Sequence, residues 1–362
     1  MTRVGRVLKA MEEQGLSQML VTDPVSVFYM TGIQIEPGER FFAMLLKKSG
    51  GHVLFLNHLF NIPEGTPFQK VWYSDTDPVM EYVKGHIDGS EILGVDKDLK
   101  ARFLLPLMEG KESKNFVNAS LAVDFTRGIK DADEQKKMRA ASAVNDQAMA
   151  KLYELVKEGT TEKEIADRLL GIYLELGAED FSFPPIVSFG ANAADPHHMP
   201  DDTVLKPGDA VLFDVGCVKD GYCSDMTRTF YYKEATEKDR EIYKLVRRAN
   251  EAAIAKIKPG VPLCELDRTA RNIIAEAGYG ENFNHRLGHF IGLSEHEFGD
   301  VSLANGQTAE PGMIFSIEPG IYLAGETGVR IEDLVLVTPD GVEILNHYTK
   351  ELTIIDKKKE AP

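Results

Sequence analysis

Hydrophobic and polar positions along the first third of the chain alternate between helical and strand spacing. Residues Val4–Gly15 carry apolar side chains at the spacing of an amphipathic helix, and Gln18–Thr22 is a short apolar run. Further along lie two β-rich stretches, a helical pattern and one more strand pattern, at Phe41–Lys47, His52–Leu56, Pro78–His86 and Ile92–Val95. Mixed helices and strands of this kind predict an α/β domain over residues 1–125.

The pattern changes near Asp124–Lys130, where a long helical stretch begins that runs to about Lys157. Thr161 and Glu164 predict a capping box for the next helix, which should end at Gly177. A similar pattern returns one hundred and one residues later and ends at Gly278. Either a half-domain is duplicated about a pseudo-twofold axis, or two ordinary helices share a glycine stop signal. Residues 126–362 are predicted to form the second domain.

Residues Val211–Phe230 show strand patterns on both sides of Lys219-Asp-Gly, which predicts a β-hairpin. Asp214 and Asp225 lie eleven positions apart and are expected to face each other across this hairpin. Like charges opposite each other repel unless a cation lies between them. A metal site therefore competes with the alternative of a solvated acidic face.

Three histidines, His285, His289 and His296, fall within twelve residues. A neutral imidazole that binds a metal, with the other two acting as acid, base or oxyanion donors, suits hydrolytic chemistry. Glu318 and Glu332 each stand in an otherwise apolar strand pattern, where a lone buried carboxylate is costly. They are expected to bind a metal or, for Glu332, to form a structural ion pair.

Composition narrows the class of protein. The chain has 362 residues, 43% of them hydrophobic, and a formal net charge of −16, which predicts a globular protein of two domains that does not bind nucleic acid. No apolar run is long enough for a signal peptide or a membrane span. The three cysteines form no C-x-x-C pair, which favours a reducing, cytoplasmic location.

The series Asp214, Asp225, His289, Glu318 and Glu332 resembles the metal ligands of the pita-bread metallopeptidases, the M24 family of methionine aminopeptidase, aminopeptidase P and prolidase. The resemblance covers about residues 130–355, and residues 1–125 resemble the creatinase-type N-terminal domain. The strings that end at His197 and His289 look most like bacterial Xaa-Pro dipeptidases. The resemblance implies a mixed α/β (α+β) fold, with a pita-bread domain behind a smaller α/β domain.

The resemblance also implies a role for each ligand. Asp214 would bind one metal, His289 and Glu318 the other, and Asp225 and Glu332 would bridge both. Four carboxylates and one imidazole suit two divalent ions per subunit, manganese first, with cobalt, zinc or iron as alternatives. A hydroxide between the metals would attack the peptide, and Glu318 would shuttle its proton.

Further residues take substrate roles by the same resemblance. Arg330 would orient the bridging carboxylates. Phe183 and Tyr322 would form an apolar wall for a proline ring. Three histidines would polarise the scissile carbonyl or stabilise the oxyanion, namely His197, His285 and His296.

The chain departs from the family pattern at two positions. Phe290 stands where glycine is common and is expected to narrow the pocket. Asp300 stands where some prolidases bind the substrate carboxylate with a basic residue, so recognition would come from elsewhere or the substrate is not a dipeptide. Arg40, on a loop that would reach the partner subunit of a homodimer, is the candidate for the missing cation.

These observations predict a metallopeptidase that hydrolyses the Xaa-Pro bond of dipeptides, with a small peptide as its partner and no membrane or nucleic acid. One alternative is aminopeptidase P, which removes the N-terminal residue from longer Xaa-Pro peptides. A second alternative is a non-catalytic pita-bread protein that only binds peptides.

Overall fold

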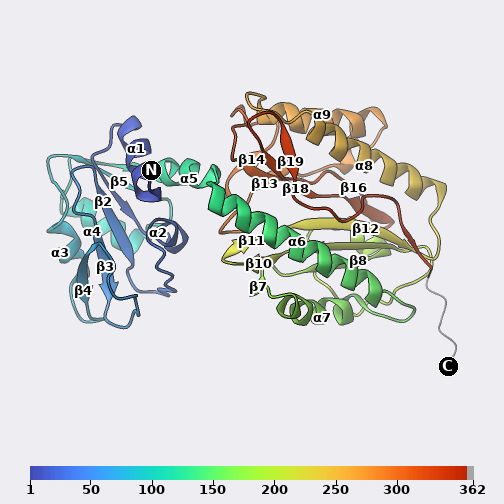
Figure 1. The fold of residues 1–362 in the computed structure, drawn as a ribbon, viewed down its shortest axis with the longest axis horizontal. Coiled ribbons are helices and arrows are strands. Elements are labelled where there is room, and N and C mark those ends of the chain that lie inside the picture. The colour runs from blue at the N-terminus through green and yellow to red at the C-terminus, as the bar shows by residue number, and fades with distance from the viewer. Residues whose placement is uncertain (357–362) are drawn as a thin grey trace. The chain divides into compact units, whose positions relative to one another are not determined.

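The computed structural model describes residues 1–356, and the chain forms two compact units, Met1–Arg127 and a second that begins at Gly128 (Figure 1). No helix within the described residues is both long and apolar enough to cross a membrane. The fold is mixed α/β in both units.

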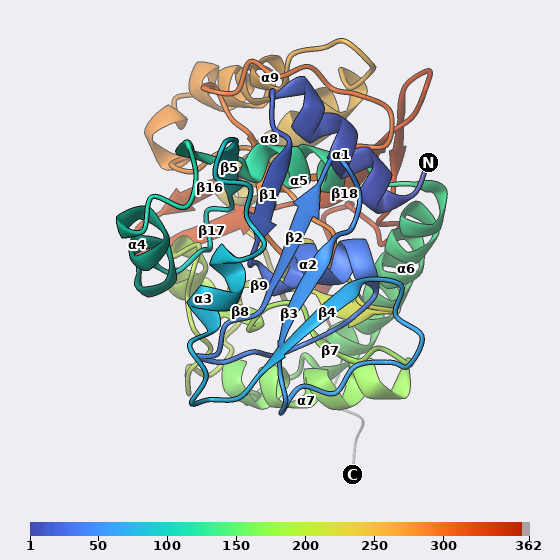
Figure 2. The ribbon, with the colours of Figure 1, turned by 90° about the vertical axis from the view of Figure 1, so that its left-hand side faces the viewer.

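The first unit is built on a six-stranded sheet in the order β4-β3-β2-β1-β5-β6 (Figure 2). The strands are β1 Gln18–Val21, β2 Ala43–Lys47, β3 Val53–Asn57, β4 Gln69–Tyr73, β5 Ile92–Val95 and β6 Asn115–Asn118. The helices are α1 Arg3–Glu13, α2 Pro24–Thr31, α3 Val79–Lys84, α4 Ala101–Glu109 and α5 Ser120–Gly128. Strand β1 is antiparallel to β2 and parallel to β5, so the sheet is mixed.

Within the described residues, the second unit contains four sheets. A four-stranded sheet has the order β20-β12-β9-β8, a five-stranded sheet the order β14-β13-β15-β18-β19, and smaller ones join β11-β10-β7 and β16-β17. The strands of its first half and its last strand are β7 Asp180–Phe181, β8 Ile186–Phe189, β9 Ala210–Val215, β10 Cys217–Lys219, β11 Tyr222–Cys223, β12 Met226–Tyr232 and β20 Ile354–Ile355. The others are β13 Gly288–Phe290, β14 Glu297–Val301, β15 Ile314–Ile317, β16 Gly320–Leu323, β17 Thr327–Arg330, β18 Asp333–Val337 and β19 Val342–Ile344.

Two pairs of helices cover these sheets. Helices α6 Ala132–Leu155 and α7 Glu162–Glu175 pack together, as do α8 Glu237–Ala255 and α9 Leu263–Glu276. The first pair shares a hydrophobic core with β9 and β12, and the second pair shares another with β15 and β18. Helices α7 and α9 begin and end at positions 101 residues apart. The matching packing supports the interpretation of two duplicated halves.

The capping box predicted at Thr161 is confirmed, because its side chain accepts from the N–H of Glu164 while the Glu164 carboxylate accepts from the N–H of Thr161. Gly177 and Gly278 follow α7 and α9 with φ of 80° and 89°, which only glycine adopts freely. The sequence signals for the ends of these helices therefore act as expected.

The predicted hairpin forms, but its register differs from the expectation. Asp220 and Gly221, both with positive φ, form its turn. This turn lies one position later in the chain than the turn that would place Asp214 opposite Asp225. Asp214 instead pairs with Thr227, and Asp225 lies two residues before Thr227. Positions two residues apart on a strand share a face, so the two carboxylates are diagonal neighbours rather than direct opposites.

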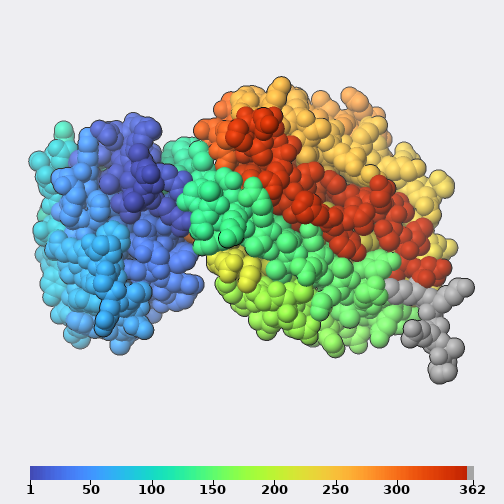
Figure 3. All heavy atoms as spheres, viewed as in Figure 1, coloured from blue at the N-terminus to red at the C-terminus, as the bar shows by residue number. Residues whose placement is uncertain are grey.

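The stretch after β19 joins the two helical pairs of this unit, as the space-filling view shows by colour (Figure 3). Asp146 of α6 accepts from the backbone N–H groups of His347 and Tyr348. From α8, the hydroxyl of Tyr243 donates to the carbonyl of Lys350. The segment His347–Lys350 therefore connects helix α6 to helix α8 through hydrogen bonds.

Candidate metal centre

All five predicted metal ligands line one cavity of about 650 Å³ in the second unit. Asp214 lies in β9, Asp225 directly before β12, and His289 in β13. Glu318 lies in the break between β15 and β16, and Glu332 in the break between β17 and β18. The expectation that both glutamates sit inside strands is wrong, because the chain leaves each ladder at the glutamate before it starts the next strand.

The ligand atoms of this cluster are close enough to share a cation. Single ligand atoms of Asp225, His289 and Glu332 all lie within 4.8 Å of one another. Nε2 of His289 is 3.5 Å from Oδ2 of Asp225 and 3.6 Å from Oε1 of Glu318. Three buried carboxylate oxygens have no hydrogen-bond partner, namely Oδ1 of Asp214, Oδ1 of Asp225 and Oε1 of Glu332. Such oxygens are costly unless a cation accepts their lone pairs, so the residues fit divalent metal ions.

The protonation states agree with this fit. Burial, with the neighbouring charge of Glu332, raises the pKa of Asp225 well above its usual value. Burial also raises the pKa of Glu318, to about 7. It lowers the pKa of His289 to about 3, so this imidazole is neutral. Nδ1 of His289 lies 3.2 Å from the carbonyl of Phe290, and a proton on Nδ1 leaves the Nε2 lone pair aimed at the carboxylates.

Arg330 is buried beside the cluster and forms hydrogen bonds with it. Its buried guanidinium donates from Nη2 to Oδ2 of Asp214 at 2.6 Å and from Nε to the hydroxyl of Thr227 at 3.0 Å. Thr227 in turn donates to Oε2 of Glu332 at 2.8 Å. Asp214 and Glu332 thus each have one carboxylate oxygen held by a hydrogen bond, while the other oxygen has no partner. Arg330 therefore contacts Asp214 directly and reaches Glu332 only through Thr227, and its predicted role of orienting the bridging carboxylates stays a prediction.

Tyr322 connects the same arginine to a histidine. Its hydroxyl accepts from Nη1 of Arg330 and lies 2.9 Å from Nε2 of His285. Burial lowers the pKa of His285 to about 4, so the ring is neutral at physiological pH. The Tyr322 ring is buried and does not line the cavity, in contrast to the expected apolar wall. Its place in this chain of contacts suits a positioning residue.

The remaining predicted substrate residues of this unit do line the cavity: Phe183, His197, His285 and His296. The ring of His296 packs edge-on against that of His289, with centroids 4.2 Å apart. Sequence reasoning missed two charged lining residues, Glu295 and Arg286. Their positions beside two of the singled-out histidines were the available signal.

The two family departures lie away from the cavity wall. Phe290 is buried in the hydrophobic core against Phe315, because it follows His289 on a strand and so points to the opposite face. The prediction that it narrows the pocket is wrong. Asp300 does not line the cavity either, and its Oδ1 accepts from the hydroxyl of Ser302. The expected repulsion of a substrate carboxylate therefore has no basis in this geometry.

Arg40 belongs to the first unit, and its guanidinium is engaged there. Nε and Nη2 donate to both carboxylate oxygens of Asp75, at 2.8 and 2.9 Å. Arg40 borders a cavity of about 260 Å³ formed by that unit alone. Its predicted contact with substrate stays a prediction.

A second group of acidic residues and a histidine, Glu162, His198 and Asp201, also lies close together. Here every oxygen of the buried Glu162 is occupied. Oε1 accepts from the N–H of Phe189 and from Asn192, and Oε2 lies 2.7 Å from Nε2 of His198 and accepts from the N–H of Asp201. This cluster needs no cation.

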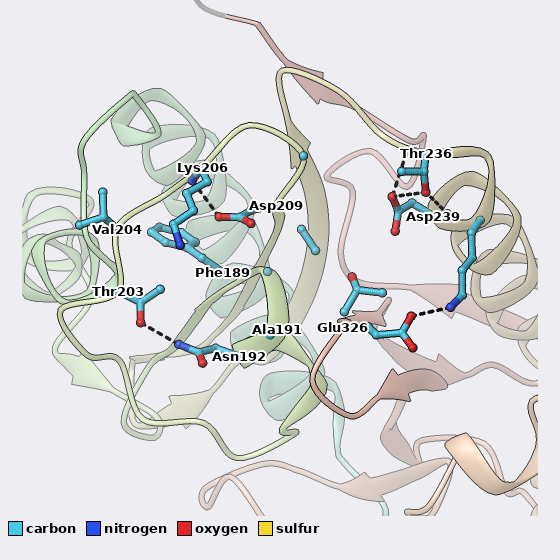
Figure 4. Close-up of a pocket in the computed structure, with 15 residues that line it drawn as sticks. Phe189, Ala191, Asn192, Thr203, Val204, Lys206, Asp209, Thr236, Asp239 and Glu326 are labelled. Atoms are coloured by element: carbon cyan, nitrogen blue, oxygen red, sulfur yellow. Dashed lines mark hydrogen bonds and ion pairs between the residues drawn. The ribbon is translucent and has the colours of Figure 1, made fainter.

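Another cavity, of about 540 Å³, lies beside β9 and the start of α8 and contains none of the predicted site residues (Figure 4). Its charged side chains are largely paired within the protein. Lys238 contacts Glu326, and Asp239 accepts from Thr236. Asp209 accepts from the N–H of Lys206. The cluster of unpartnered carboxylates is therefore the stronger candidate for chemistry.

The fold and the site together define a metal-dependent hydrolase, with candidate ligands in or beside strands of both larger sheets of the second unit. The chain belongs to metallopeptidase family M24, whose model matches residues 136–339, and the creatinase/prolidase N-terminal domain matches residues 3–129.

Comparison with individual proteins agrees with the family. An uncharacterized peptidase of Staphylococcus aureus (strain MSSA476) is 40% identical over 97% of this chain and 100% of its own. The Xaa-Pro dipeptidase from Bacillus anthracis is 31% identical, with a TM-score of 0.90 over 98% of this chain and 99% of that one. The X-Pro aminopeptidase from Thermotoga maritima MSB8 is 28% identical, with a TM-score of 0.85 over 98% and 100%. The chain is thus a metallopeptidase that resembles both kinds of proline-directed enzyme.

Proposed function

We propose that the protein is a metal-dependent Xaa-Pro dipeptidase, a prolidase that hydrolyses the bond before a C-terminal proline. The observation that carries this proposal is the set of three buried, unpartnered carboxylate oxygens beside the neutral His289, in a cavity of about 650 Å³. The similarity to the Bacillus anthracis Xaa-Pro dipeptidase supports the substrate class.

The five-residue cluster would hold two divalent ions, with Asp225 and Glu332 between them. When bound, the ions supply Lewis acidity that makes water a strong nucleophile at neutral pH and offsets charge in the intermediate. We assign manganese first, with cobalt, zinc or iron as alternatives, because hard and borderline ligands form the cluster.

Residues of the chain would carry out the proton transfers and the orientation. Ser316 donates to Oε1 of Glu318, which leaves Oε2 to take a proton from water and deliver it to the leaving nitrogen. His296 and His197, both on the cavity wall, would donate to the carbonyl oxygen as its charge grows.

The apolar part of the wall suits a proline ring. Phe183, Ile186 and Pro196 lie on the cavity surface together with the polar residues. A proline ring that packs against these residues would have its scissile peptide bond directed toward the five-residue cluster. We retain Phe183 as the residue that binds the ring and treat Tyr322 as a support for His285 and Arg330.

An X-Pro aminopeptidase is the second candidate function, because the chain also resembles the Thermotoga maritima enzyme. Such an enzyme would use the same cluster on longer peptides. A non-catalytic peptide-binding protein suits the structure less well, since it would have no use for the five grouped ligands. We further propose that the protein is cytoplasmic, in keeping with its three free cysteines. We also propose that it forms a homodimer, which light scattering tests.

The deciding experiment compares two matched substrates, Ala-Pro and Ala-Pro-Ala, with chelator-stripped protein and with added Mn²⁺, Co²⁺ or Zn²⁺. Metal-dependent cleavage that favours Ala-Pro supports the dipeptidase. A preference for Ala-Pro-Ala replaces it with the aminopeptidase. Failure to cleave either peptide with any metal overturns both.

A further inference from the structure

Two arginines line the catalytic cavity, and their guanidinium groups differ in what they contact. Arg330 is buried and bonded to Asp214, Thr227 and Tyr322. Arg286 is exposed, and no residue within 1–356 forms an ion pair with its guanidinium or accepts a hydrogen bond from it. The cavity therefore has one cationic side chain that is structural and one that is available to a ligand.

The backbone around Arg286 is fixed although its side chain is not. Arg271 of α9 donates to the carbonyls of Phe283 and His285. Asp267, the ion-pair partner of Arg271, accepts from the N–H of Leu287. The residues on both sides of Arg286 are thus anchored to one helix. Such anchoring presents the guanidinium from a defined position and reduces the entropy lost when it binds a ligand.

We propose that Arg286 binds the C-terminal carboxylate of the substrate and thereby selects dipeptides over longer peptides. This inference rests on the proposed function and names its specificity residue. A guanidinium matches a carboxylate with two parallel hydrogen bonds, which a neutral side chain does not reproduce. A tripeptide places its carboxylate one residue further away, and an amide removes it.

The other charges of the site leave this role to Arg286. The remaining wall residues that carry charge are the five-residue cluster's carboxylates, which would hold the metal ions, and Glu295, which repels an anion. Asp300 does not line the cavity, and Arg40 is bound to Asp75 in the first unit. Burial lowers the pKa of His296, and the charge of Arg286 lowers it further, which agrees with a guanidinium close to the histidines that face substrate.

The test compares steady-state kinetics of Arg286→Gln with wild type on Ala-Pro and on its C-terminal amide, both enzymes loaded with Mn²⁺. We expect KM for Ala-Pro to rise roughly 10- to 100-fold while kcat changes little, because a charge-assisted contact to the substrate is lost. KM for the amide should stay within about twofold, since the amide has no charge to lose. Arg286→Lys should give an intermediate KM for Ala-Pro.

Arg248→Gln is the matched control, because Arg248 is an exposed arginine of α8 that does not line this cavity. It should leave both KM values unchanged. An equal rise of KM for acid and amide, or no rise for either, would overturn the role of Arg286 while wild-type cleavage of Ala-Pro still supports the dipeptidase. If wild type cleaves neither compound, the proposed function itself fails, and the role of Arg286 fails with it.

Discussion

Among residues 128–356, two clusters combine carboxylates with a histidine, and they stabilise their charge in opposite ways. In the cluster of Glu162, His198 and Asp201, donors from the protein occupy both oxygens of the buried glutamate. In the cluster around His289, three buried oxygens of Asp214, Asp225 and Glu332 have no partner. Acidic side chains that lie close together therefore do not by themselves indicate a metal site. Buried carboxylate oxygens without a hydrogen-bond partner are the feature that indicates such a site.

The largest effect is expected when a cluster oxygen is removed. Glu332→Gln should lower metal content to near background and activity roughly a thousandfold, because an amide keeps the shape but loses the charge that holds the cations. Metal analysis of the purified variant and hydrolysis of Ala-Pro measure both effects. Glu162→Gln is the matched control and should keep its metal and most of its activity.

The comparison between the clusters fails if the two variants behave alike. Loss of metal in Glu162→Gln would mean that the saturated cluster also binds a cation. Full metal content and turnover in Glu332→Gln would remove the basis for the candidate centre.

A smaller effect is expected at Arg330, which contacts the cluster without belonging to it. Arg330→Lys keeps the charge but cannot reach Asp214, Thr227 and Tyr322 together. Metal affinity or kcat should fall about 10- to 100-fold. Competition between the protein and a calibrated chelator measures the affinity, and circular dichroism confirms folding. Unchanged values for both would show that the orientation of the carboxylates does not depend on this arginine.

The saturated cluster should matter for stability instead. Glu162→Gln removes a charged acceptor from the hydrogen bonds to Phe189, Asn192 and Asp201. We expect the free energy of unfolding to fall by about 1–3 kcal/mol. Urea unfolding of metal-loaded protein measures this change. A variant as stable as wild type would indicate that these contacts add nothing to the fold.

The smallest effect concerns pH in the metal-free protein. The pKa of Glu318 is about 7 in the folded protein, above its ordinary 4.5, and burial raises that of Glu332 in the same direction. Raised pKa values mean that the folded state binds protons more tightly, so this stabilisation is complete below the unfolded pKa and is lost as pH rises through the folded one. The lowered pKa values of His285 and His289 act in the opposite direction below about pH 6.5, so Tm of stripped protein should fall between about pH 6.5 and pH 8. A Tm that rises over this interval would contradict the assignment.

Much of the fold follows from local signals in the sequence. The pattern of residues 1–100 gives α1, β1, β2, β3, α3 and β5, since each has a clear period or a run of apolar residues. Helices α2, α4 and α5 and strands β4 and β6 were missed. Pro106 lies inside α4 and argues against a helix, whereas Asp23 before Pro24 at the start of α2 was a usable capping signal.

The residues of the candidate site could be predicted from the sequence, but the contacts among them could not. Spacing indicates the five candidate ligands. The register of Asp214 and Asp225 depends on where the turn falls, and a turn one position later changed the partner of Asp214 to Thr227. Periodicity does not show which side of a strand faces a cavity, so Phe290 was assigned to the pocket. The free guanidinium of Arg286 is visible only once the partners of every other charge are known.

The proposed metal centre is tested by a stepwise titration of chelator-stripped protein with Mn²⁺, in which bound metal and hydrolysis of Ala-Pro are followed together. We predict two ions per chain, activity that rises with their binding, and neither effect in Glu332→Gln. Full activity of stripped protein, or metal binding that Glu332→Gln leaves unchanged, would contradict it.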